Sequence, residues 1–433
     1  KKALSIKPDY AEVHNNIGAT YHSQGRLDEA IDAYNQSLSI NPKDDAVRVQ
    51  MLNQKAHICE WGSIDEDNKV IPKLGTLTKA VDPFSMLCLE DAPERHRIRS
   101  ENFVREKISQ KTYNLLLNQK NKNTPIRIGY FSADFHNHAT MYLLSQIFVE
   151  HNKTKFEIFA YSYGPRKQDE MRNRLINNVH NFHDVYEMSD IQIVKLARAD
   201  KLDIAIDLKG FTKDQRLRIF SYGLAPVQIS YLGYPGTSGT NFINYIVGDF
   251  VTIPQEKCKY YSENIIFMPN SYQPTDNTRN ISQKLIKREE MGLPSNGFVF
   301  CCFNNNYKIS PKEFDIWMTI LSEIDRSILW LLNSNPWATK NLKKEAELRG
   351  ICSNRLVFAE RVPQAEHLAR HRLADLFLDT FKINAHTTAS DALWAGLPVV
   401  TMLGESFASR VGASLLNAVG LPELVTENED DYK

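Results

Sequence analysis

The segment KINAHTTASDALWAGLPVVTM (382–402) holds residues whose types and spacing suit the binding of a diphosphate. His386, Thr387 and Thr388 follow a short apolar run and precede a predicted helix. The N–H groups at a helix N-terminus carry a partial positive charge, and threonine hydroxyls add further donors. Asp391 lies one turn into the helix, where its carboxylate can accept bonds from ribose hydroxyls. This segment therefore predicts a nucleotide-phosphate site.

A lysine in FNNNYKISP (303–311) is a second candidate for the same group. Lys308 follows a predicted strand and precedes a helix for which Ser310 is the expected N-cap. A cation at the carboxyl end of a strand can neutralise the charge of a leaving diphosphate. Asn305 is expected to contact the same group. The alternative is an ordinary surface lysine.

Two basic residues lie on a predicted helix within 358–380. His367 is suited to stack on a nucleoside or to hydrogen-bond it, and Arg370 follows on the same helix face. The alternatives are a partly exposed helical histidine and a solvated surface charge.

A further group of candidates belongs to the first half of the α/β region. His136 and His138 lie in FSADFHNHAT (131–140), after a predicted strand, and a histidine there can take a hydroxyl proton near neutral pH. Asp207 ends another predicted strand. The loop after the next strand contains several glycines, which allow a ligand to approach the backbone or simply make turns: Gly233, Gly236 and Gly239.

Short apolar runs alternate with helical stretches in two series and position these residues. The pattern predicts an α/β fold with two doubly wound, Rossmann-like domains, over 125–284 and 285–433. Ligands of such sheets bind at the carboxyl ends of the strands, so a shared ligand is expected in a cleft between the domains. The predicted strands lie at 126–132, 156–162, 202–210, 227–233, 245–249, 298–304, 328–333, 355–360, 376–380 and 398–403.

The N-terminal region carries a helical repeat. ALSIKPD (3–9) recurs as SLSINPK (37–43), an offset of 34 residues. The positions between them match the tetratricopeptide template, with His14 in place of the usual tryptophan. Residues 1–42 are therefore predicted to end a longer array that binds extended peptides, and 43–124 to form a helical connector. The other matching positions are Ile17, Gly18, Tyr21, Ala30, Tyr34 and Pro42.

Composition excludes several classes of function. Lys+Arg and Asp+Glu both number 52, so a nucleic acid or an anionic membrane surface is not an expected partner. No run of 18 apolar residues predicts a membrane helix, and six scattered cysteines favour a reducing, cytoplasmic compartment. The dinucleotide, P-loop and hydrolase-elbow motifs are missing from the sequence. Asp65 and Asp67 spell D-x-D, but in an expected inter-helix loop, so no metal site is predicted.

Five strings together resemble the protein O-GlcNAc transferases, in family order from residue 126 to 396: IRIGYFSADFHNHAT, APVQISYLGYPGTSG, FNNNYKISP, VPQAEH and NAHTTASDALWAG. That family joins tetratricopeptide repeats to a GT-B glycosyltransferase with two Rossmann-like lobes. The resemblance implies UDP-GlcNAc as donor substrate, no separate cofactor, and inverting transfer to Ser/Thr hydroxyls of protein or peptide acceptors.

The resemblance also assigns individual residues. It places His138 at the sugar and acceptor site, Asp207 near a position discussed as a base, and Lys308 at the diphosphate. Asn305 stands where the animal enzymes have glutamine. The nucleotide contacts that it implies are His367 and Arg370 on the nucleoside side, and His386, Thr387, Thr388 and Asp391 at the phosphates and ribose.

The sequence departs from the family pattern at several points, so alternatives to GlcNAc transfer stay open. Gln364 replaces a lysine of the animal enzymes, the insert between their lobes is missing as in bacterial relatives, and the second lobe is expected to be truncated. SPINDLY-like O-fucosyltransferases using GDP-fucose are the first alternative, although AHTTAS and GYPGT favour GlcNAc over the plant-type GTTTT and GYPNT. A bacterial N-glucosyltransferase is disfavoured by the type of repeat. A repeat scaffold with an inactive lobe is disfavoured because the candidate site residues are retained.

Overall fold

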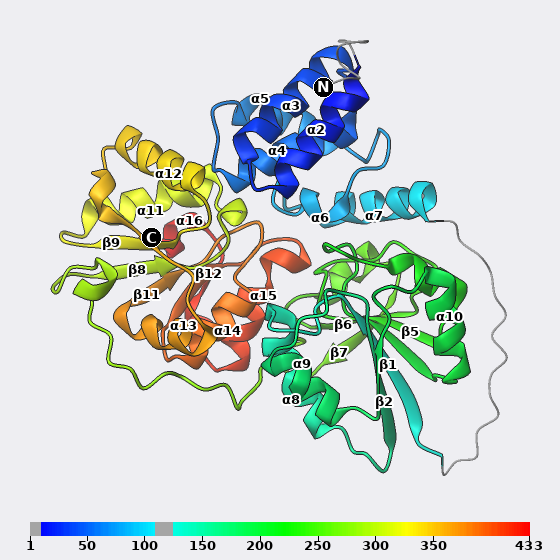
Figure 1. The fold of residues 1–433 in the computed structure, drawn as a ribbon. Helices are drawn as coiled ribbons and strands as arrows, with labels where there is room; N and C mark the ends of the chain where they lie inside the picture. The colour runs from blue at the N-terminus through cyan, green and yellow to red at the C-terminus, as the bar shows by residue number, and fades with distance from the viewer. Residues whose placement is uncertain (1–9, 109–123) are drawn as a thin grey trace. The chain divides into compact units, whose positions relative to one another are not determined.

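The computed structural model describes residues 10–108 and 124–433, and the chain divides into two compact units (Figure 1). One unit joins the N-terminal helices, up to Ala92, with the chain from Asn280 onward. The other unit runs from Pro93 to Arg279. The segment 43–124 thus contributes helices to both units, and the repeat string 3–9 lies outside the described residues.

The N-terminal helices begin with a tetratricopeptide hairpin. Gly18 of α2 packs under Tyr34 of α3 so closely that a Cβ atom at Gly18 would lie 2.5 Å from the tyrosine ring. Asp65 and Asp67 belong to the first turn of α5, so the expectation of an inter-helix loop there is wrong. The described elements are α2 (Ala11–Ser23), α3 (Leu27–Ile40), α4 (Asp45–His57), α5 (Ile64–Val70), the 3-10 helix η1 (Ile71–Lys73) and α6 (Pro83–Met86).

A parallel sheet of six strands forms the second lobe, in the same unit as these helices, with the order β10-β9-β8-β11-β12-β13. Its central strands read as continuous apolar runs because helices cover both faces. The strands are β8 (Val299–Cys302), β9 (Ile328–Leu332), β10 (Leu356–Ala359), β11 (Leu376–Leu378), β12 (Val399–Met402) and β13 (Val425–Thr426). The helices are α11 (Pro311–Glu323), α12 (Pro336–Leu348), α13 (Gln364–Arg370), α14 (Thr387–Trp394), α15 (Val411–Ala418) and α16 (Glu429–Tyr432).

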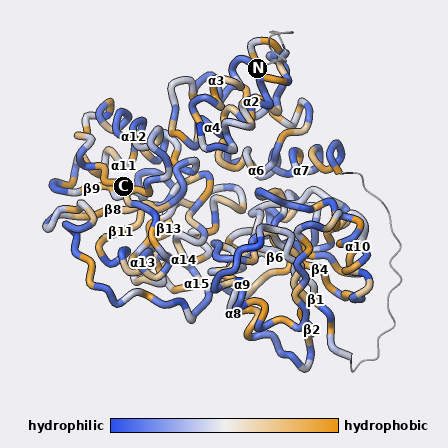
Figure 2. The backbone as a smooth tube through the Cα atoms, in the orientation of Figure 1, coloured by the Kyte–Doolittle hydropathy of each residue, from blue (hydrophilic) through white to orange (hydrophobic). Residues whose placement is uncertain are grey.

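The first lobe has a parallel sheet of seven strands in the order β3-β2-β1-β4-β5-β6-β7. Figure 2 shows hydrophobic stretches around β1 and α8, which share one buried core. Its strands are β1 (Ile126–Ser132), β2 (Phe156–Ser162), β3 (Asn181–Asp184), β4 (Ile204–Asp207), β5 (Val227–Ser230), β6 (Tyr245–Asp249) and β7 (Asn264–Met268). Its helices are α7 (Pro93–Lys107), α8 (Ala139–Glu150), α9 (Glu170–Asn178) and α10 (Asp190–Ala199).

The strand order of each sheet positions the candidate residues. β1 lies between β2 and β4, and β8 lies between β9 and β11. The order of the strands along the sheet therefore reverses direction at β1 and at β8. The loops after such strands form the usual ligand crevice of doubly wound sheets. The predicted pair of Rossmann-like domains is therefore confirmed. Across residues 10–108 and 124–433, no helix has the length and apolar character needed to cross a membrane.

Candidate active site

In the second lobe, the ends of β8 and β11 are tied together by Asn304. Its Nδ2 atom donates hydrogen bonds to Oγ1 of Thr380 at 2.8 Å and to Oδ1 of Asp379 at 3.2 Å. The hydroxyl of Thr388, in the first turn of α14, donates to Oδ1 of Asn304. The N-terminus of α14 is thereby fixed against the strand that carries the Lys308 loop.

Lys308 lies at the end of a short 3-10 helix, η5 (Asn306–Lys308), which Asn305 precedes as N-cap. Its Nζ atom donates a hydrogen bond of 2.8 Å to the carbonyl oxygen of Asn384. Burial lowers the pKa of Lys308 to about 8, although the nearby carboxylate of Asp379 opposes this shift. The side chain is therefore still largely charged at neutral pH, as binding of a diphosphate requires.

His386 is the N-cap residue of α14, and Thr387 begins the helix. Atom Nε2 of His386 lies 3.1 Å from the carbonyl oxygen of Ala408, a contact that requires Nε2 to carry the proton. Burial, followed by the charge of Lys308, lowers the pKa of His386 to about 3. His386 is therefore neutral at physiological pH, and the positive charge of this region comes from Lys308 and the helix terminus.

On the nucleoside side, Asp391 is only 4% exposed. Gln364 donates a hydrogen bond of 3.3 Å to Oδ1 of Asp391, and Nε2 of His367 lies 3.7 Å from Oδ2. The ring of His367 packs against the rings of Phe303 and His371, with centroid distances of 5.5 and 4.7 Å. The structure thus brings together His367, which the sequence linked to the nucleoside, Asp391, which it linked to the ribose, and Gln364. Their contacts to a nucleotide stay a prediction.

Arg370 lies in the core of the second lobe and is only 3% exposed. Its guanidinium lies 4.5 Å from the ring centroid of Phe303, and Nη1 donates to the carbonyl oxygen of Glu360 at 2.6 Å. The alternative of a solvated surface charge is therefore wrong. Through Phe303, Arg370 supports the position of His367, and its nucleotide-binding role stays a prediction.

In the first lobe, His138 is the N-cap residue of α8. Atom Nδ1 accepts a hydrogen bond of 3.2 Å from the backbone N–H of Thr140, while 42% of the imidazole side chain is exposed. Asp207 is buried, and its two carboxylate oxygens accept bonds from the backbone N–H groups of Lys209 and Gly210 at 2.9 and 3.0 Å. Burial raises the pKa of Asp207 to about 6. Asp207 therefore holds the turn that follows β4.

The glycines of the loop after β5 lie against other segments of the same chain. A Cβ atom at Gly233 would lie 2.0 Å from the carbonyl oxygen of Leu208, and Gly239 has a positive φ of 65°. The buried carboxylate of Glu263 accepts hydrogen bonds from the backbone N–H and the hydroxyl of Ser238, which fix the loop. Turn geometry and packing thus explain these glycines.

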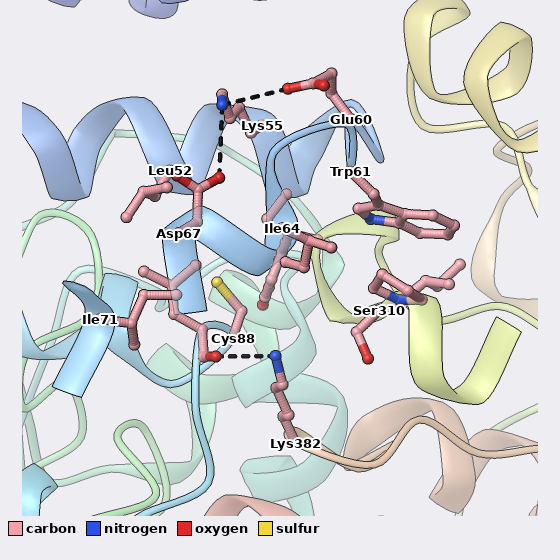
Figure 3. A pocket seen from close by; sticks show the side chains of 15 residues that line it. Leu52, Lys55, Glu60, Trp61, Ile64, Asp67, Ile71, Cys88, Ser310 and Lys382 are labelled. Carbon is pink, nitrogen blue, oxygen red and sulfur yellow. Dashed lines mark hydrogen bonds and ion pairs between the residues drawn. The ribbon is translucent and has the colours of Figure 1, made fainter. Parts of the chain in front are cut away.

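The N-terminal helices adjoin the Lys308 loop within their common unit. A pocket lies between α4, α5 and η1 on one side and the segments around Tyr307 and Lys382 on the other (Figure 3). Lys382 donates a hydrogen bond of 2.8 Å to the carbonyl oxygen of Leu89. The ring of His57 lies 4.9 Å from that of Tyr307, the residue before Lys308. The helices that follow the repeat therefore pack against the loop that carries Lys308.

Sequence reasoning missed several residues that organise these loops. Their signals are polar side chains at or after the carboxyl ends of the predicted strands, and these signals become meaningful only once the strands are known to be neighbours. They are Asp134, Lys209, Asn304, Asp379 and Asn384. Within residues 10–108 and 124–433, no three His, Cys, Asp or Glu side chains group as metal ligands, and independence from metal stays a prediction.

Two family comparisons cover most of the chain. The family described as Glycosyl transferase family 41 matches residues 83–288 and 275–433, and the tetratricopeptide repeat matches residues 11–44. Among solved structures, a mutant of the O-GlcNAc transferase of Thermobaculum terrenum is similar, with a TM-score of 0.81 and 25% identity. That match covers 100% of this chain and 83% of that chain.

Plant and animal relatives carry related names. A probable UDP-N-acetylglucosamine–peptide N-acetylglucosaminyltransferase, SEC of Arabidopsis thaliana, is 36% identical over 314 residues, 71% of this chain and 32% of the relative. The Caenorhabditis elegans UDP-N-acetylglucosamine–peptide N-acetylglucosaminyltransferase is 29% identical over 420 residues, 71% of this chain and 36% of the relative. The SPINDLY protein of Arabidopsis thaliana is 31% identical over 327 residues, 73% of this chain and 34% of the relative.

The chain spans about a third of the length of these relatives. The resemblance to O-GlcNAc transferases that the five sequence strings carry is confirmed at the level of the family. The chain belongs to glycosyl transferase family 41 and joins a tetratricopeptide repeat to a GT-B pair of Rossmann-like domains.

Proposed function

We propose that this protein transfers GlcNAc from UDP-GlcNAc to Ser/Thr hydroxyls of proteins, with inversion at the anomeric carbon. Family membership and the names of its relatives support a sugar-nucleotide transferase acting on peptides. The observation that carries the proposal is the joining of the Lys308 ammonium to the segment before α14 through Asn384. Together with the Asn304–Thr388 contact, it holds a cation and a helix N-terminus in place, which supports their proposed role as donors for one diphosphate.

In this reaction the acceptor oxygen forms a bond to the anomeric carbon as the bond from that carbon to the β-phosphate oxygen breaks. Negative charge grows on the departing UDP, where fixed donors lower the barrier most. Lys308 and the N–H groups at the start of α14 supply those donors. His386 adds a neutral side chain whose Nε2–H is already bonded to Ala408.

We assign His138 a positioning role in preference to that of a base. Because Nδ1 accepts the backbone N–H of Thr140, the neutral ring carries its proton on Nε2. An Nε2–H group can donate a hydrogen bond to a sugar or acceptor oxygen, but it has no lone pair with which to take a proton. The acceptor proton must then leave by another route, directly or through water.

The remaining elements of the proposal concern partners and compartment. Protein or peptide acceptors are proposed to bind the repeats, as such arrays favour extended peptides. No cofactor besides the donor sugar nucleotide is proposed. A cytoplasmic location is supported by the six cysteines, which all lie within the described residues and form no disulfide.

O-Fucosyl transfer from GDP-fucose is the second candidate, and it rests on the resemblance of the sequence to SPINDLY-like proteins alone, because the SPINDLY relative is itself named as a probable UDP-N-acetylglucosamine–peptide N-acetylglucosaminyltransferase. Incubation of the purified protein with an acceptor protein mixture and either donor, followed by mass spectrometry, separates the two. We expect N-acetylhexosamine on Ser/Thr from UDP-GlcNAc. Deoxyhexose from GDP-fucose alone would replace our proposal with the second candidate. Transfer from neither donor, with UDP still bound, would favour the inactive scaffold.

A further inference from the structure

A buried ion pair lies beneath the imidazole ring of His138. The Nζ atom of Lys209 lies 2.8 Å from Oδ2 of Asp134, and the two side chains are only 5% and 11% exposed. The hydroxyl of Thr140 donates to the same oxygen at 3.3 Å. Atom Nδ1 of His138 lies 3.6 Å from it. Three polar groups thus meet at one carboxylate oxygen, and the lysine is the nearest.

The ring of His138 has two hydrogen-bonding states available in this setting. In the first, Nδ1 accepts the backbone N–H of Thr140, and the proton sits on Nε2. In the second, the ring is protonated at both nitrogens, so Nδ1–H turns to the Asp134 carboxylate and no longer caps α8. The second state is favoured only if the Asp134 carboxylate lacks another cation.

We propose that Lys209 is a positioning residue that, by neutralising Asp134, holds His138 neutral, with Nδ1 as the acceptor that caps α8 and Nε2–H as a donor. Lys209 therefore acts through His138 and does not itself contact substrate. Only the use of that donor toward a sugar or acceptor oxygen rests on the proposed transferase function. The choice of tautomer is a property of the protein alone.

The charges around His138 agree with this assignment. Burial lowers the pKa of His138, the Asp134 carboxylate raises it, and Lys209, His136 and Lys167 lower it further. The ring of His136 lies 5.6 Å away, and its own pKa is lowered, first by burial and then by Lys167. Asp134 is thus the anionic group that favours imidazolium at this position, and Lys209 is bonded to it directly.

Titration of His138 by nuclear magnetic resonance tests the proposal in the whole chain. Histidine labelled with ¹³C and ¹⁵N is incorporated, and the His138 signals are assigned by their loss in His138→Asn. The wild-type ring should carry its neutral proton on Nε2 and titrate below the ordinary histidine pKa. In Lys209→Met, the pKa should rise by about one unit or more, and protonation of Nδ1 should accompany it.

Matched variants separate charge from packing. Lys209→Arg should keep the wild-type titration because it keeps the cation. Asp134→Asn/Lys209→Met removes both charges and should also return the His138 pKa toward the wild-type value. Lys213→Met removes an exposed lysine of the same loop and should change nothing. In transfer assays, Lys209→Met should move the acid limb of the pH profile toward higher pH, by the same amount as the His138 pKa.

Two outcomes would overturn the proposal. An unchanged His138 pKa and tautomer in Lys209→Met would do so, as would a wild-type ring that carries its neutral proton on Nδ1. If Lys209→Met does not fold, Asp134→Asn alone decides, because loss of the carboxylate should lower the His138 pKa. If the wild-type protein transfers no sugar, the proposed function fails, while the titration still tests the role of Lys209.

Discussion

The Nζ atom of Lys308 donates a 2.8 Å hydrogen bond to the carbonyl oxygen of Asn384 and so joins the loop after β8 to the segment leading into α14. The lysine is thereby held in place. Among the described residues no carboxylate oxygen lies within ion-pair distance of its Nζ atom, so its charge is left for an anion. Because burial already depresses the pKa of Lys308, a bound diphosphate would stabilise the charged form. This relationship makes the functional behaviour of Lys308 testable.

Replacement of Lys308 by alanine should lower the transfer rate by about 10²–10³, because a fixed cation near a growing negative charge is lost. Turnover and UDP affinity of Lys308→Ala should be measured together. Lys312→Ala, which removes an exposed lysine at the start of α11, serves as the control and should retain wild-type rates. More than half of normal activity in Lys308→Ala would show that the Lys308 charge is not needed for transfer.

The affinity for UDP should fall as pH rises through about 8, the pKa of Lys308 in the free protein. Below that pH the ammonium is charged and the affinity should be level. Above it, each pH unit should weaken binding by up to about tenfold, because binding then requires uptake of a proton. Calorimetric titration of wild type and Lys308→Met across this range checks the prediction. An equal decline in both proteins would assign the effect to another group.

Transfer should survive a chelator such as EDTA. The charge of the leaving UDP is met in our proposal by Lys308 and by the N-terminus of α14, at Thr387 and Thr388. The assay compares initial rates before and after exhaustive chelation, with Mn²⁺ added back as the control. Activity that disappears with EDTA and returns with Mn²⁺ would contradict this mechanism.

The contact of Asp91 with the second lobe should contribute measurably to stability. Its carboxylate accepts hydrogen bonds from the backbone N–H groups of Glu405 and Ser406 and from the hydroxyl of Ser409, at 2.7, 2.8 and 2.9 Å. Asp91→Ala should therefore lower the free energy of unfolding of this unit by about 2–4 kcal/mol. Urea and thermal unfolding measure the change, and the exposed Asp430→Ala should shift neither curve.

Most of the fold could be predicted because buried parallel strands read as unbroken apolar runs, as in ILWLLN around β9. Three strands were missed: β3, β7 and β13. Each lies at an edge of its sheet, where one side is unpaired. β7 (NIIFM) is apolar and as long as β6, so its sequence does not explain the miss, whereas β3 (NFHD) is polar and β13 (VT) has only two residues. Periodicity carries little information for such strands.

The candidate site was predicted only as far as local signals reach. N-cap and proline signals correctly placed Lys308 before a helix, because those signals act within a few residues. The contacts that organise the loops join residues far apart in sequence, as Thr388 and Asn304 show with a separation of 84 positions. The burial of Arg370 likewise depends on Phe303, from another strand's end, which helix spacing cannot indicate.

Substitutions of His138 should distinguish a hydrogen-bond donor from a base. His138→Gln keeps an N–H group near the position of Nε2 but has no group that can take a proton at neutral pH. If His138 positions sugar or acceptor, His138→Gln should retain more activity than His138→Ala, and His138→Ala should weaken donor or acceptor binding as well as turnover. If His138 is the base, both variants should lose about 10²–10⁴ in turnover with donor binding nearly unchanged.

His138→Asn, which can still accept the N–H of Thr140, controls for loss of the helix cap. We expect the first pattern, because Nδ1 is engaged by the cap and Nε2 carries the proton. Equal and severe loss in the alanine and glutamine variants, with UDP and UDP-GlcNAc affinities intact, would instead make His138 the base, and unchanged turnover in all three would remove it from the site.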